Sequence, residues 1–519
     1  ERFSDFYSKM YPGMRWMNKN TSDLDKPMFI CEYAHAMGNA IGNLREYWEV
    51  IERSNSTIGG CIWDWVDQAI YDPAEMKNGV YRLHTGYDYP GPHQGNFCSN
   101  GIVSPERQEG AKLAEVKAAH QFVKFKMRLV NEDSNLATVH FRNKYAFTSL
   151  DRFDLVYEVV RNGHVAGRKK MALPAVLPDN GVEISLKLPK IKLRKERAAG
   201  NEILLNLYVQ QRAATASEPA GHRVAQAQYV LTERTVLPKL ASRGEALTQT
   251  AALDHTTIGN KKVSVTFNNT TGDLTSLAFG GRNVLAEGQG FRYDNHRWIE
   301  NDRYTHTENG LSDKGSLEVT TDREGNTVVK TRRDGSLCAT DITYTILPQG
   351  IVDMDVTFTP KTGNLRRAGL VCGIDTAFSN VSYYAYGPWE NYCDRKDGTL
   401  LGRYATTVED MPEHYVKPQS TGGRESMREL ILTDKSGFGL KIETEGQVNF
   451  SALRFTDADL MKAQHMWELT PRPYTVLHLD AWTRGIGNAS CGQDVGTLPK
   501  YCVPETPQRY KLRLSAAGK

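Results

Sequence analysis

The sequence has no apolar run close to the roughly 20 residues that a membrane-spanning helix needs. Its first residues, Glu-Arg-Phe-Ser-Asp, also lack the charged and apolar pattern of a secretory signal peptide. We therefore expect a soluble protein with no membrane partner. Because the chain opens without methionine, the sequence leaves both the cytoplasm and the periplasm open as its compartment.

Neither sign of charge dominates. The chain has 64 Lys and Arg against 61 Asp and Glu, a net charge of +3, which gives no electrostatic reason to expect nucleic acid as a partner. The basic stretch at 191–202 has no interleaved aromatic residues, so we interpret it as a solvated loop. Eight cysteines include no CxxC pair, which favours free thiols over a metal site.

The length and the hydrophobic pattern predict several domains. A chain of 519 residues with 40% hydrophobic residues can bury three or four separate cores. Helical and strand patterns alternate over residues 1–122, whereas short period-two runs dominate 123–240 and 241–519. Ser242–Asp254 is small and polar, and we interpret it as a linker. The fold class is therefore an α/β domain followed by two β-sandwich domains.

The α/β part contains a β–α–β unit. Met28–Cys31 and Thr57–Trp63 have the apolar character of buried strands, and apolar residues at helical spacing occupy 41–51 between them. Such a unit implies parallel strands. A further strand is expected to end near Met10 and Tyr11, and Glu109–Phe122 is expected to form an amphipathic helix.

Glu32 follows the first of these strands directly, where a buried carboxylate would be costly without partners. Reacting groups gather at the carboxyl ends of parallel strands, and Trp63 lies at the end of the next strand. A carboxylate beside an indole suits a sugar ring, and glycosidases use paired carboxylates. Glu32 could equally pair with a buried cation, and Trp63 could belong to the core. For Asp64 and Asp67 we favour structural capping of the following loop.

Long motifs resemble the large bacterial β-galactosidases of glycoside hydrolase family two. They include KPMFICEYAHAMGNAIGNLREYW and GGCIWDWVDQAIYD near the N-terminus, and YGPWENYCDRKDGTLLGRY and ELTPRPYTVLHLDAWTRGIGNASCG in the β region. The resemblance implies the C-terminal part of a (β/α)8 TIM barrel over 1–122, an immunoglobulin-like β-sandwich over 123–240, and the antiparallel β-sandwich of the family's small chain over 241–519.

The resemblance also implies roles for individual residues. Glu32 matches the catalytic nucleophile, which forms a covalent galactosyl-enzyme with a β-galactoside substrate. Tyr11 resembles the tyrosine that hydrogen-bonds this nucleophile. His35 matches a histidine that lines the galactose pocket, and Trp63 matches the tryptophan under the sugar.

Two metal ions are implied in the same way. Phe97 and Asn100 resemble residues that bind Na⁺ through a carbonyl oxygen and an amide oxygen, and Asn100 also belongs to the substrate pocket. Such hard oxygen ligands suit the ion. In the family the Mg²⁺ ligands and the general acid/base glutamate lie on earlier segments, so we expect both outside this chain.

The chain departs from the family in two respects. A whole barrel takes roughly 250 residues, whereas about 122 precede the β region, so we expect a C-terminal fragment whose partner is the N-terminal portion of the same enzyme. Alone it should not turn over substrate, and self-association stays open. Cys491 falls near the position of a family tryptophan that stacks on the leaving group, and a thiol cannot stack. The alternatives are a non-catalytic carbohydrate-binding or assembly module and a related activity such as β-glucuronidase.

Overall fold

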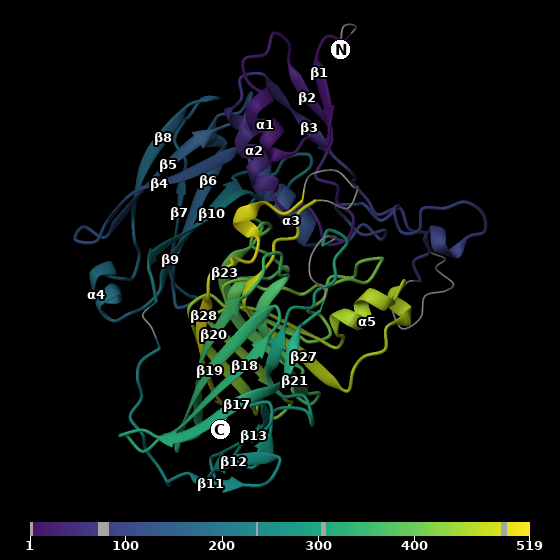
Figure 1. Cartoon of the computed structure of the whole chain (residues 1–519). Coiled ribbons are helices and arrows are strands. Elements are labelled where there is room, and N and C mark those ends of the chain that lie inside the picture. The colour runs from purple at the N-terminus through teal and green to yellow at the C-terminus, as the bar shows by residue number, and fades with distance from the viewer. Residues whose placement is uncertain (1–3, 71–81, 235–236, 303–307, 489–495, 519) are drawn as a thin grey trace. The chain divides into compact units, whose positions relative to one another are not determined.

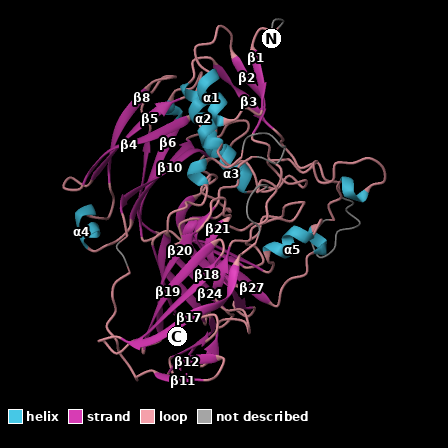
Figure 2. Ribbon diagram, in the orientation of Figure 1, coloured by secondary structure: helices cyan, strands magenta, loops and turns pink. Residues whose placement is uncertain are grey.

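The computed structural model describes residues 4–70, 82–234, 237–302, 308–488 and 496–518, and strands are the main regular secondary structure in it (Figure 2). Contacts divide the chain into two compact units: residues 1–115, 239–399 and 404–519 form the first, and 116–238 with 400–403 form the second. The predicted multidomain, β-rich fold is therefore confirmed. None of the described helices is both long and apolar enough to cross a membrane.

The first unit begins with a parallel sheet in the order β1-β2-β3, formed by Tyr7–Met10, Met28–Tyr33 and Thr57–Ile62 (Figure 1). Helix α1 (Met14–Asn20) and helix α2 (Leu44–Arg53) lie in the connections. Helix α2 forms because its apolar residues recur on one face, which buries Leu44, Tyr47, Val50 and Ile51. The predicted parallel β–α–β unit is confirmed.

A third parallel pairing follows β3 in the chain. Val66 and Val103 form an isolated parallel bridge, and helix α3 (Ala111–Ala119) follows. This helix is shorter than the predicted span of 109–122. Phe122, which the pattern placed on its apolar face, lies past the helix end and is exposed.

The second unit contains two antiparallel sheets that share one core. One sheet has the order β4-β5-β8 and the other β10-β9-β6-β7, with bounds Val123–Asn131, Leu136–Asn143, Gly181–Lys187, Arg223–Thr232, Ile203–Gln211, Phe153–Arg161 and His164–Ala172, in that order. The basic stretch at 191–202 is not a plain loop, because Leu193–Ala198 form helix α4. Leu193 is fully buried and Glu196 pairs with Arg161, so two residues fix this turn of helix to the sandwich.

The rest of the first unit is built from three sheets around a large core. A nine-stranded sheet has the order β17-β18-β19-β20-β28-β25-β24-β22-β23, with bounds Leu311–Thr321, Thr327–Gly335, Cys338–Leu347, Ile351–Pro360, Gln508–Ala517, Gly439–Glu445, Glu429–Thr433, Asn380–Gly387 and Leu400–Thr407. A four-stranded sheet has the order β16-β21-β27-β26, with bounds Arg292–Asp294, Arg367–Asp375, Tyr474–Thr483 and Asn449–Leu453.

The third sheet, β11 to β15 in chain order, has bounds Thr248–Ala251, His255–Gly259, Val263–Asn268, Leu274–Phe279 and Arg282–Asn283. The predicted hairpin around residues 268–273 is confirmed, because β13 and β14 pair there. The predicted linker at 242–254 is wrong in its second half, where β11 pairs with β12. Every residue of β11 is exposed, so no apolar side chain marked the strand in the sequence.

Phe267→Ala tests the core of this unit. Phe267 is fully buried and packs edge-to-face on Tyr344, with ring centroids 4.9 Å apart. Removing the ring should lower the free energy of unfolding by about 3–5 kcal/mol, measured by denaturant titration. Leu253→Ala, at a side chain that is 99% exposed, should change it by less than about 0.5 kcal/mol. Equal effects of the two substitutions would contradict the proposed core.

Candidate functional site

The candidate site lies at the carboxyl ends of the three parallel strands. Tyr11 follows β1, Glu32 lies one residue before the end of β2, and Trp63 follows β3. The backbone N–H of Tyr11 donates to the carbonyl of Glu32 at 2.8 Å, and that of Trp63 donates to the carbonyl of Tyr33 at 3.1 Å. Because parallel strands end at one edge of a sheet, three sequence-predicted residues come together there.

His35 and Phe97 extend this group. The rings of Tyr11 and His35 meet edge-on with centroids 6.0 Å apart, and the rings of His35 and Phe97 stack at 5.3 Å. Tyr11 and His35 are buried, whereas Phe97 and Trp63 are 38% and 39% exposed. The group therefore presents buried polar rings next to accessible aromatic surface.

The Glu32 side chain is partly exposed, and no described residue forms a hydrogen bond or ion pair with its carboxylate. The alternative of a structural carboxylate paired with a buried arginine or lysine thus finds no support among the residues that the structure describes. Asp64 and Asp67 behave differently. Asp64 accepts the side-chain amide of Gln68 at 2.6 Å, so it caps the following loop as predicted. Asp67 has a structural role of another kind, because it accepts the N–H of Gly101, 34 positions away, at 2.6 Å.

Burial, the larger cause, and the nearby charge of Lys112 together lower the pKa of His35 to about 4. The imidazole is therefore neutral near pH 7, with one nitrogen as donor and the other as acceptor. A neutral imidazole can donate one hydrogen bond to a hydroxyl group and accept another, whereas an imidazolium can only donate.

Lys112, on α3, was not predicted and connects two loops of the site. Its buried ammonium donates to the carbonyl of Ala36 at 2.8 Å and to that of Gly101. Burial lowers the pKa of Lys112, and the negative charge of Asp67 opposes that shift. No local pattern indicates this role, because a single lysine in an amphipathic pattern is normally solvated.

Residues from the C-terminal part of the first unit bind the loop that follows β2. The Asn39 side-chain amide donates to the Tyr392 hydroxyl and to the Ser420 carbonyl, both at 2.9 Å. The backbone N–H of Asn39 donates to the Gln419 side chain at 3.1 Å, and Arg395 donates to the carbonyl of Ala40 at 2.8 Å. The position of His35 therefore depends on residues more than 350 positions away.

Phe97 and Asn100 provide oxygen atoms that fit a monovalent cation. Asn100 is 4% exposed, its amide nitrogen donates to the Phe97 carbonyl at 3.1 Å, and its buried Oδ1 has no hydrogen-bond partner among the described residues. Rotating the amide by half a turn would place the Asn100 amide oxygen next to the carbonyl oxygen of Phe97. Such a pair is unfavourable without a cation and suitable for one such as Na⁺.

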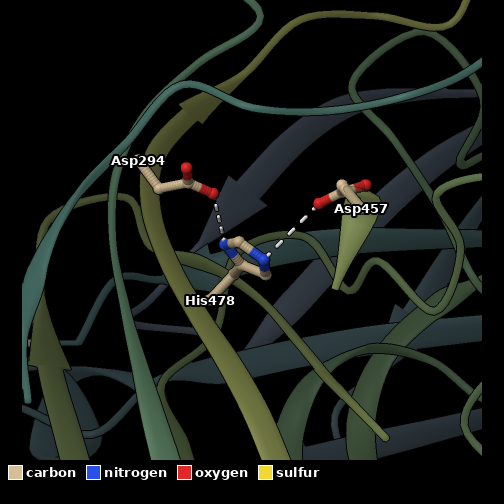
Figure 3. A group of neighbouring side chains, drawn as sticks. All are labelled: Asp294, Asp457 and His478. Carbon is tan, nitrogen blue, oxygen red and sulfur yellow. Dashed lines mark ion pairs between the residues drawn. The ribbon is translucent and has the colours of Figure 1, made fainter. Parts of the chain in front are cut away.

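A second group of possible metal ligands lies elsewhere in the first unit (Figure 3). The ring of His478 lies between two carboxylates, with Nδ1 3.6 Å from Asp294 and Nε2 3.6 Å from Asp457. Arg367 also pairs with Asp457, at 3.2 Å. Because the carboxylates face different ring nitrogens, one ion could not take all three ligands well. Burial and the charge of Arg367 hold the pKa of His478 well below its usual value, so we interpret the group as a buried polar cluster in which Arg367 supplies the positive charge.

The predicted aglycone position, Cys491, lies outside the described residues. The preceding Asn488 is described, and its side-chain amide donates to the carbonyl of Gly42. Asn488 thus contacts the loop after β2.

Three protein-family models match consecutive parts of the chain. They are "Glycosyl hydrolases family 2, TIM barrel domain" over residues 1–125, "Beta-galactosidase, domain 4" over 139–232 and "Beta galactosidase small chain" over 259–514.

Individual relatives match almost the whole chain. A β-galactosidase of Priestia megaterium is 30% identical over 92% of this chain and 46% of its own length, and one of Actinobacillus pleuropneumoniae is 28% identical over 98% and 50%. The chain thus spans about half the length of the curated relatives it matches. A solved galactose 1-epimerase from Lactobacillus acidophilus NCFM covers 53% of the chain at 9% identity, with a TM-score of 0.30 that is too low to carry an argument.

The low pKa of His35 predicts a pH dependence of stability. Its folded-state pKa of about 4 lies below the ordinary value of 6.5, so the unfolded chain binds this proton more readily. Between pH 6.5 and 4 the group should therefore destabilise the fold by about 1.4 kcal/mol per pH unit as the pH falls. His35→Gln should lose less stability than wild type over this range in denaturant titrations. Parallel pH profiles of the two proteins would contradict the assignment.

Proposed function

Because the chain belongs to the β-galactosidase group of glycosyl hydrolase family 2, we propose that it is the nucleophile-bearing part of a retaining β-galactosidase. The reaction is hydrolysis of terminal, non-reducing β-D-galactose residues. The observation that supports this most directly is the accessible carboxylate of Glu32, which shares one edge of a parallel sheet with Tyr11 and Trp63.

At the level of fold, we propose that β1–β3 and α1–α3 form the C-terminal part of a (β/α)8 barrel. The parallel order of the strands and the parallel Val66–Val103 bridge support this. In the same scheme the second unit is an immunoglobulin-like sandwich, and residues 241–519 are the small-chain β-sandwich domain.

In the proposed mechanism the ionised Glu32 attacks the anomeric carbon and forms a galactosyl ester, which water then hydrolyses. The partial exposure of Glu32 supports this role, because a substrate in contact with solvent can reach its carboxylate. A retaining enzyme needs a second carboxyl group about 5–5.5 Å away as general acid and base. We propose that this group comes from a segment outside these 519 residues.

The neighbours of Glu32 receive supporting roles. Tyr11 adjoins Glu32 through the backbone bond, and its hydroxyl is assigned to orient the carboxylate. The neutral His35 imidazole is assigned to a galactose hydroxyl. The accessible indole of Trp63 would pack on the C–H face of the ring, a contact worth on the order of 1 kcal/mol.

The carbonyl of Phe97 and the amide oxygen of Asn100 would hold the Na⁺ ion, together with a substrate hydroxyl. When bound, the ion supplies a fixed positive charge that orients this hydroxyl. Asn100 is held in place because its backbone carbonyl accepts the N–H of Asp64 at 2.6 Å. The Mg²⁺ ion implied by the family stays a prediction for residues outside this chain.

Glu32→Gln tests the nucleophile. In a protein that carries the complete barrel, the substitution should lower turnover of a nitrophenyl β-galactoside about a thousandfold or more, because an amide cannot form the ester intermediate. Glu49→Gln, at an exposed carboxylate on α2, should leave turnover unchanged.

A second readout identifies the attacking atom. Azide should restore nitrophenol release by Glu32→Ala and yield a galactosyl azide of inverted configuration, because the small anion enters the space of the lost carboxylate. Wild-type turnover by Glu32→Gln, or rescue without inversion, would end the assignment.

Asn100→Ala tests the cation site. Loss of the amide oxygen should raise the half-saturating Na⁺ concentration about tenfold or more, measured by titration of turnover and by the broadening of the ²³Na resonance. Asn96→Ala serves as the matched control, because its amide donates to Glu300 at 3.3 Å instead. An unchanged Na⁺ response of Asn100→Ala would contradict the proposed ligand.

A further inference from the structure

The first unit contains a cleft of about 450 Å³ whose lining includes neither Glu32 nor Trp63. Its lining comes from Asp67 and from three stretches of chain, within residues 102–112, 383–389 and 404–424. The volume lies within the range of about 300–1,000 Å³ that is typical of small-molecule sites. We propose that this cleft binds a neutral mono- or disaccharide, at a second site apart from that of Glu32.

The floor of the cleft carries buried groups of both signs. Lys112, Arg424 and Asp67 line it and are each at least nine-tenths buried, and the carboxyl group of Glu413 lies beside them. Two cationic and two acidic groups leave no strong net charge to attract an ion. Hydroxyl groups both donate and accept hydrogen bonds, so a polyhydroxylated neutral molecule suits such a floor.

Arg424 leaves a donor group for a ligand. Its Nε donates to the Tyr383 hydroxyl at 3.2 Å and its Nη1 to the Gly423 carbonyl at 3.1 Å, whereas Nη2 makes no hydrogen bond to any described residue. A 95% buried guanidinium with a remaining N–H group is costly unless another molecule accepts that bond. The floor therefore provides a fixed donor inside the cleft.

Aromatic rings form the walls. Trp389 and Tyr404 are half-buried and line the cleft, and the ring of Tyr404 packs on that of Tyr383 at 5.5 Å. Such rings offer flat surfaces for the C–H faces of a sugar. At the rim, the exposed Glu109 and Asp410 add carboxylates, which accept hydrogen bonds from hydroxyl groups and repel anionic ligands.

The test is calorimetric titration of the chain with galactose, glucose, lactose and cellobiose at pH 7. Trp389→Ala should weaken binding of the best of these sugars about fivefold or more. Trp389→Phe should retain most of the affinity, and Trp63→Ala should leave this binding unchanged. Phe147→Ala, at a 98% exposed ring outside the cleft, is the matched control.

Gln108→Ala provides a variant that does not endanger the fold, because Gln108 is an exposed residue of the cleft lining. It should also weaken binding, with an unchanged circular dichroism spectrum. The proposal is overturned if none of the four sugars shows saturable binding, or if Trp63→Ala abolishes binding that Trp389→Ala leaves intact. Tighter binding of glucuronate than of glucose would contradict the proposal that the ligand is neutral. None of these results depends on turnover, so they are distinct from a failure of the galactosidase proposal.

Discussion

The buried ammonium of Lys112 donates to the carbonyl oxygens of Ala36 and Gly101, which belong to two different loops of the candidate site. Burying such a charge costs several kcal/mol unless opposite charge and hydrogen bonds offset it. Asp67 supplies the opposite charge and accepts the N–H of Gly101. The loops that carry His35 and Asn100 are thereby fixed relative to each other, and the same ammonium favours the neutral form of His35.

The repeated Gly-Asn pairs of the motif AMGNAIGN have a common physical explanation. Gly38 has φ of +59°, and a side chain there would collide with Gln419, while a side chain at Gly42 would collide with Asp394. Because Gly38 and Gly42 have no side chains, the loop after β2 can lie close to Gln419 and Asp394. The neighbouring Asn39 then donates hydrogen bonds to Tyr392 and Ser420. The conformation of the loop after β2 is thus determined both by the strands and by the C-terminal part of the first unit.

Local periodicity predicted the parts of the fold that depend on local sequence. Strands β2 and β3 and helix α2 follow from apolar spacing, and the position of Glu32 and Trp63 at strand ends follows from parallel pairing. Family resemblance, rather than pattern, pointed to Tyr11 and Asn100. Contacts such as that between Asn39 and Tyr392 could not be predicted, because nothing in either local sequence indicates a partner 353 residues away. Strand β11 escaped detection because all of its residues are exposed, so its sequence shows no alternation of buried and exposed side chains.

The hydrogen bond between Asn39 and Gln419 spans 380 positions of the chain. A ribosome adding about 5–20 residues per second takes roughly 20–80 s to cover that distance. During this interval the newly synthesised loop after β2 lacks the hydrogen-bond partners that determine its conformation. The segment bearing Glu32 is therefore synthesised early and reaches its final conformation late, after the C-terminal part of the first unit has been made.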